Sequence, residues 1–255
     1  LAKFRLNDPI SGFEFKHEFR PMLSLNYGST VNAVTFSPDG KYLAIGGKKS
    51  YALVFDLTKT TKDFVKFKSG HLINSVAFSS DGQFLAIGGW DWKARVFNLS
   101  TGQEVKIFKH KYDVSIVNFS PDGQFLATGS RYEDYSDYGI TRVFNVSNGQ
   151  EVKSFKYRAN YSGGYTFSIA FSPNGKYLAT PGGVYSLETG DKVNSLVGDV
   201  FSPDGKFLAS KSGIYNLETG ERVRYFGGTA FSPDGKYIAA TSKKGALLYR
   251  TLFQV

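Results

Sequence analysis

One pentapeptide recurs along the chain, and this repeat constrains the fold more than any other feature of the sequence. It has the form Phe-Ser-Pro-Asp-Gly or a close variant, and its copies begin at Phe36, Phe78, Phe119, Phe171, Phe201 and Phe231. The copies are 42, 41, 52, 30 and 30 residues apart. A period of about 40 residues has room for four short strands. Because a sheet of that size buries its faces only against neighbouring sheets, the period predicts stacked units that would not fold in isolation.

The residues of the first repeat predict four consecutive strands. Residues 31–36 form the first strand, and the turn Ser37-Pro38-Asp39-Gly40 follows, in which Pro presets φ and Gly accepts a positive φ. Residues 41–47, 51–57 and 64–68 are the second, third and fourth strands. In later repeats a glycine turn joins the third strand to the fourth, at Gly102, Gly149, Gly190 and Gly220.

An aromatic residue followed by a polar one ends most third strands. The pairs are Phe55-Asp56, Phe97-Asn98, Phe144-Asn145, Tyr185-Ser186 and Tyr215-Asn216, and one Gly-His pair stands at Gly70-His71. Together with the period and the turns, these residues resemble the WD-repeat family over nearly the whole chain. The resemblance implies a β-propeller that serves as a binding scaffold rather than an enzyme. Since Phe or Tyr stands where the family has Trp, we expect aromatic packing to hold the blades rigid.

We therefore predict an all-β fold in which residues 1–255 form a single β-propeller domain of six four-stranded blades, with blades four to six shortened. Residues 13–19 are expected to complete the last blade beside residues 246–250, because a closed ring protects the edges of its sheets. A further strand at residues 2–6 leaves a seventh, incomplete blade as the alternative.

The composition limits the cell compartment and the class of protein. The chain is 41% hydrophobic and has no cysteine, so its core needs no disulfide, and we expect a cytoplasmic location. No apolar run approaches the roughly 20 residues that span a bilayer, which predicts no membrane insertion. The first residue is Leu1 rather than Met, so we expect a processed chain or part of a larger multidomain protein.

The lengths of the connections predict where a partner binds. The second-to-third connection of blade three spans residues 130–139, and the next connection spans 157–165, whereas residues 210–213 and Gly227-Gly228 keep the later blades low. In the family's wiring these connections lie on one face. The two long connections therefore form a raised wall on that face beside a low area formed by the short connections of the later blades. Tyr and Arg are enriched at interface hot spots. The predicted binding residues are Arg131, Tyr132, Tyr135, Tyr138, Tyr157, Arg158 and Tyr161, extended by Trp90 and Trp92.

Three alternatives remain open at this stage. The long loops could be tolerated insertions whose tyrosines pack against one another, and Trp90 and Trp92 could equally be packing residues. A carbohydrate-binding or small-ligand-binding or processing propeller is the second functional class. The lysines of the fourth strands, such as Lys66, Lys106 and Lys153, could attract nucleic acid, but Lys on an outer strand also prevents edge-to-edge aggregation, and we favour that role. No specific nucleic-acid partner is expected.

The sequence favours neither catalysis nor a cofactor. Its three histidines, His17, His71 and His110, fall at different blade boundaries, so they suggest neither a zinc site nor a nucleophile and base pair. Glu133, Asp134 and Asp137 lie in one loop and could form a carboxylate pair for glycoside hydrolysis or a calcium site. Without a second acidic partner elsewhere, they give little support to either. The aspartates of the repeated pentapeptide are expected to form turns.

Overall fold

The computed structural model describes residues 5–6, 25, 27–59, 64–131, 138–158, 168–210, 212–224, 227–232, 234–242 and 245–252. Strands and turns account for the regular structure of these residues, and they contain no helix. The strands form six antiparallel four-stranded sheets, as the repeat predicts. The all-β prediction is confirmed, while the number of blades in the complete ring stays a prediction.

The first three sheets have strands of five to eight residues. They consist of β2 (Val31–Phe36), β3 (Tyr42–Gly47), β4 (Tyr51–Asp56) and β5 (Phe64–Lys68); β6 (Ile73–Phe78), β7 (Phe84–Gly89), β8 (Lys93–Asn98) and β9 (Glu104–Lys109); and β10 (Val114–Phe119), β11 (Phe125–Arg131), β12 (Tyr138–Asn145) and β13 (Glu151–Arg158). The bounds of the first sheet agree with the predicted strands to within one residue at each end.

The next two sheets are smaller, with strands of two to four residues. They consist of β14 (Ala170–Phe171), β15 (Tyr177–Thr180), β16 (Gly183–Ser186) and β17 (Lys192–Asn194), and of β18 (Val200–Phe201), β19 (Phe207–Ser210), β20 (Gly213–Asn216) and β21 (Arg222–Arg224). The last sheet contains β22 (Gly227–Phe231), β23 (Tyr237–Ser242), β24 (Gly245–Leu252) and β1 (Arg5–Leu6). The prediction that blades four to six are shortened is right for the fourth and fifth sheets and wrong for the sixth, whose strands β22, β23 and β24 have five, six and eight residues.

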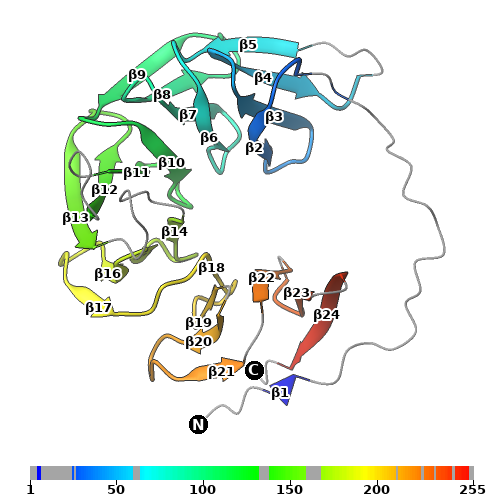
Figure 1. Ribbon diagram of the computed structural model, residues 1–255, viewed down its shortest axis with the longest axis vertical. Helices are drawn as coiled ribbons and strands as arrows, with labels where there is room; N and C mark the ends of the chain where they lie inside the picture. The colour runs from blue at the N-terminus through cyan, green and yellow to red at the C-terminus, as the bar shows by residue number, and fades with distance from the viewer. Residues whose placement is uncertain are drawn as a thin grey trace.

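The six sheets follow one another around a central space, as Figure 1 shows. The first strand of each sheet lies nearest the centre and the fourth lies at the periphery. The connections between the strands lie at the two ends of each sheet. We call the end with the pentapeptide turns the turn end, and the end where the second strand connects to the third the loop end.

Each pentapeptide turn is closed by its own side chains. Ser37 Oγ donates to Asp39 Oδ1 at 2.6 Å and accepts from the backbone N–H of Tyr42 at 2.9 Å, while Asp39 Oδ1 also accepts from Lys41 N at 3.1 Å. Gly40 completes the turn at φ +71°. The same serine-to-carboxylate or serine-to-amide bond recurs at Ser79–Asp81, Ser120–Asp122, Ser172–Asn174, Ser202–Asp204 and Ser232–Asp234. The aspartates are turn formers, as predicted.

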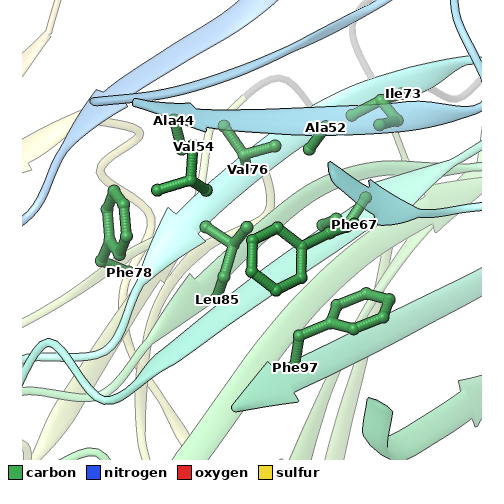
Figure 2. Close-up of a cluster of buried hydrophobic side chains, with 10 residues drawn as sticks. Ala44, Ala52, Val54, Phe67, Ile73, Val76, Phe78, Leu85 and Phe97 are labelled. Carbon is green, nitrogen blue, oxygen red and sulfur yellow. The ribbon is translucent and has the colours of Figure 1, made fainter. Parts of the chain in front are cut away.

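Neighbouring sheets pack through apolar side chains that the repeat supplies. Figure 2 shows one such cluster, where Val54 and Phe67 of the first sheet meet Val76 and Leu85 of the second. Gly46 makes this approach possible, because a Cβ atom at that position would lie 2.5 Å from Cγ2 of Ile73. Rings also pair between sheets, with centroids 5.4, 4.6 and 4.4 Å apart in Phe67–Phe97, Phe108–Phe144 and Phe155–Tyr185. The predicted aromatic packing is confirmed.

The inner strand β2 differs from its counterparts in the next sheets. Val31, Val34 and Phe36 are 42, 55 and 62% exposed, whereas the equivalent residues of β6 and β10 are at most 9% exposed. The described residues therefore leave this face of β2 uncovered.

The last sheet takes its fourth strand from the N-terminal part of the chain. Arg5 pairs with Leu252 and Leu6 with Thr251 in antiparallel register. The segment predicted for this place, residues 13–19, lies outside the described residues, so the strand beside β24 is the earlier of the two candidates. Both segments have the alternation of a strand, and only the long-range pairing distinguishes them.

Candidate interaction surface

Two tryptophans stand on the turn between β7 and β8, at the loop end of the second sheet. Trp90 is 50% exposed and Trp92 is 56% exposed. Trp92 has φ +62° and is the one non-glycine residue with positive φ in the described part of the chain. That backbone conformation costs an L-residue roughly 1–2 kcal/mol. The turn thus holds two large apolar side chains about half exposed to solvent, and neither of them is buried.

An arginine holds this turn in place. Arg95 Nη2 donates to Asp91 Oδ2 at 2.5 Å, Nη1 donates to Glu104 Oε2 at 2.7 Å and Nε donates to the Ser69 carbonyl at 2.9 Å. The Arg95 and Asp91 side chains are only 12 and 14% exposed. Because hydrogen bonds between charged groups are the stronger kind, the guanidinium fixes the turn against the preceding connection.

The connection before β6 supports Trp90 from the side. The ring of His71 stacks on Trp90 with centroids 6.1 Å apart and planes 11° from parallel. His71 is itself held, because its Nδ1 accepts from the Leu72 N–H at 2.8 Å. The Trp90 N–H donates to the Leu72 carbonyl at 2.9 Å, and the His110 N–H donates to the Trp92 carbonyl at 2.8 Å. Both tryptophans are consequently placed by neighbouring backbone before any partner arrives.

The wall predicted at blade three is in part an extension of the sheet. Strand β11 extends to Arg131, β12 begins at Tyr138 and β13 extends to Arg158. These three residues are therefore paired within the sheet. Tyr138 is 48% exposed and Arg158 is exposed. The structure describes only the backbone of Arg131, and Tyr132, Tyr135 and Tyr161 lie outside the described residues.

Tyr157 departs from the prediction that it lines the surface. It is only 6% exposed. A Cβ atom added at Gly139 would lie 2.5 Å from Cε2 of Tyr157, and a Cβ atom added at Gly182 would lie 2.4 Å from Cβ of Tyr157. The strand alternation explains the difference, since Tyr157 points to the same side of β13 as the buried Phe155. Tyr157 therefore packs between sheets.

A family model described as WD domain, G-beta repeat (WD40) matches the chain at residues 20–56, 62–98 and 102–136. Residues 20–136 carry WD40 repeats. Domains made of WD40 repeats are generally non-catalytic scaffolds that bind protein partners. The search of curated proteins found no match.

Within these WD40 repeats, the register places Lys48-Lys49-Ser50 of the first sheet where the second has Trp90-Asp91-Trp92. Lys49 Nζ lies 5.7 and 5.5 Å from the ring centroids of Tyr27 and Tyr51. Neither His71 nor Arg95 was among the predicted site residues. One signal in the sequence could have identified Arg95. Arg95 and Arg142 each stand two residues before the aromatic residue that ends a third strand.

His110, in the third matched WD40 repeat, is a buried packing residue. It is 8% exposed, and its ring lies edge-on to Phe144 at 5.8 Å. Burial, with a smaller contribution from the charge of Arg142, lowers the pKa of His110 to about 3. The ring is therefore neutral at physiological pH. His17, Glu133, Asp134 and Asp137 lie outside the described residues.

No three metal-ligating side chains gather in the described part of the chain, and the same residues contain no helix with the length and apolar character that a membrane crossing requires.

Proposed function

We propose that this chain is a non-catalytic interaction module whose protein partner binds the loop end of the second to fourth sheets. The observation that carries the proposal is the pair Trp90 and Trp92, half-exposed on a turn that Arg95 and Asp91 hold rigid. Tryptophan is the residue type most enriched at interface hot spots. Rigid aromatic side chains lose little conformational entropy on binding, so a preformed turn favours affinity.

The proposed surface continues from the tryptophans to the loops of the third sheet. Tyr138 and Arg158 offer exposed aromatic and cationic groups there. Arg131, Tyr132, Tyr135 and Tyr161 belong to the proposal through their place in the sequence, next to these residues. Tyr157 is left out because it is buried.

The test begins with peptides selected against the whole chain from a displayed random library. The affinity of a selected peptide is then measured for the wild type and for the double variant W90A/W92A. A hot-spot pair worth about 2 kcal/mol or more predicts a loss of at least about 30-fold. The control is Ile107→Ala, because Ile107 is 44% exposed on the outer strand β9, away from the loop end. It should change the affinity by less than about twofold.

The same peptide divides the proposed surface into its two parts. Y132A/Y135A/Y161A tests the loops of the third sheet separately from the tryptophan turn. If the selected peptides bind W90A/W92A and this triple variant as tightly as the wild type, the partner does not bind the loop end and the proposal is wrong. Unchanged melting temperatures for both variants would show that the effect belongs to binding.

A carbohydrate ligand is the second candidate, and the exposed indole rings are what favour it, since planar rings can stack on a sugar. Soluble hexasaccharides of glucose and of N-acetylglucosamine should then quench the fluorescence of Trp90 and Trp92. A saturable response in the wild type that W90A/W92A lacks would favour the carbohydrate, whereas no response to either sugar favours the protein partner.

A further inference from the structure

A cavity of about 320 Å³ lies at the turn end of the second to fifth sheets. The phenylalanine that opens each pentapeptide supplies its walls, at Phe78, Phe119, Phe171 and Phe201, together with two prolines. The polar side chains Asn118 and Asp199 also line it. Because the turn end and the loop end are opposite ends of the same sheets, this cavity is separate from the tryptophan turn and does not depend on the function proposed above.

Asp199 breaks the repeat at this cavity. It stands two residues before Phe201, and the equivalent residues of the other sheets are Val34, Val76, Val117, Ile169 and Thr229. Val76, Val117 and Ile169 are buried at 7, 3 and 3% exposure, whereas Asp199 is exposed. Its backbone is tied to the neighbouring strand β19, since the Asp199 N–H donates to the Ala209 carbonyl at 2.7 Å. A carboxylate therefore stands, just before the two-residue strand β18, where the second and third sheets have a buried valine.

The charge of Asp199 is not balanced from within the part of the chain that the structure describes. No ion pair or hydrogen bond of its carboxylate to another described residue is found there. Asn118 uses its Nδ2 to donate to the Ile169 carbonyl at 3.1 Å, so its Oδ1 remains an acceptor. The cavity thus has one anionic side chain, Asp199, and the neutral side chains of Asn118, Ser80 and Ser120 beside its phenylalanines.

These features select one kind of ligand. Asp199 is the only charged side chain in the lining, and this set is poor for Ca²⁺, which takes six to eight oxygen ligands. An ammonium or guanidinium group on an apolar stem suits this lining, because the carboxylate pairs with its charge and the phenylalanines and prolines contact the stem. The volume is within the roughly 300–1,000 Å³ of ordinary ligand sites.

We propose that the cavity binds the basic side chain, lysine or arginine, of a peptide. Asp199 pairs with the cation, the Asn118 amide oxygen accepts a hydrogen bond from it, and the phenylalanines cover its methylene stem. The turn end then carries a second binding site, and its selectivity for a positive charge comes from Asp199.

The test uses N-acetyl-arginine amide and N-acetyl-lysine amide as probes, with N-acetyl-norleucine amide as the neutral probe that has a similar apolar stem. Amide resonances of the whole chain are followed by NMR during each titration. The basic probes should shift the resonances of Asn118, Asp199 and Val200 in a saturable way, and the neutral probe should not. Asp199→Asn should weaken the binding at least tenfold, and added salt should weaken it in the wild type.

Asp191→Asn is the matched control, because Asp191 is an exposed aspartate on the turn between β16 and β17. It should leave the titration unchanged. Asp199→Val restores the residue of the repeat and provides a second variant that should fold and lose the binding. Equal binding of basic and neutral probes, equal binding by Asp199→Asn and the wild type, or shifts confined to the loop end would each overturn the proposal.

Discussion

The guanidinium of Arg95 donates to the carboxylate of Asp91 at 2.5 Å, and Asp91 stands between the two exposed tryptophans in the sequence. The same guanidinium also bonds Glu104 and the Ser69 carbonyl. One side chain thereby ties the turn, the outer strand and the preceding connection of the second sheet together. This link was not expected from the sequence, which predicted aromatic packing as what holds the blades rigid.

Replacing Arg95 by Met should therefore destabilise the second sheet. The substitution removes three hydrogen bonds and leaves two carboxylates without their partner, so we expect the free energy of unfolding to fall by about 2 kcal/mol. Urea unfolding followed by circular dichroism measures the change. Lys192→Met on the outer strand β17 is the control, because this exposed lysine should contribute less than about 0.5 kcal/mol. A variant as stable as the wild type would show that the network does not hold the turn.

Trp92 should prove dispensable for stability. Asn tolerates a positive φ better than Trp does, and the Trp92 ring is 56% exposed, so Trp92→Asn should leave the free energy of unfolding unchanged or raise it by up to about 1 kcal/mol. Thermal unfolding of the variant and the wild type at the same pH provides the comparison. A loss of more than about 1 kcal/mol would mean that the indole packs against the protein and is not held out for a partner.

Gly46 should tolerate no side chain. An added Cβ would meet Ile73 Cγ2 at 2.5 Å and Val76 Cγ1 at 3.0 Å, so Gly46→Ala should cost about 1–3 kcal/mol through overpacking. In an Ile73→Ala background the obstructing methyl group is absent. The cost of Gly46→Ala should become smaller there, and a double-mutant cycle in urea measures the coupling. Costs that simply add would indicate that the two sheets do not approach as described.

His110 should make the stability of the protein depend on pH. Its folded-state pKa is about 3 against an ordinary value of 6.5, so between these values the unfolded chain binds a proton that the folded chain does not. Stability therefore falls as the pH drops below 6.5, with a slope of up to about 1.4 kcal/mol per pH unit from this group. Carboxylates titrate in the variant as well, so the difference between the wild type and His110→Phe isolates the histidine. Identical slopes between pH 7 and 5 would contradict the prediction.

Much of the fold could be predicted because its determinants are local. The turn at Ser37–Gly40 uses residues that are adjacent in the sequence, and the strands beside it follow from alternation over a few positions. The pairing of β24 with Arg5–Leu6 could not be predicted, since two N-terminal segments have the alternation of a strand and the pairing depends on contacts from the far end of the chain.

The candidate site was predictable to a smaller degree. The exposure of Trp90 and Trp92 depends on a backbone angle and on Arg95, neither of which a residue count reveals. The burial of Tyr157 was available from the alternation with Phe155, but the length of the adjoining connection suggested a loop instead.

The pairing of β1 with β24 has a consequence for the order of events in folding. The other strand pairs of the described residues join neighbours in the sequence, whereas Arg5 and Leu252 come from opposite ends of the chain. Bringing together the ends of so long a segment costs roughly 5 kcal/mol of chain entropy at 25 °C, and only two residue pairs oppose it. We therefore expect the amide hydrogens of β1 to exchange with solvent earliest and this strand to be added last, after the hairpins of the other sheets have formed.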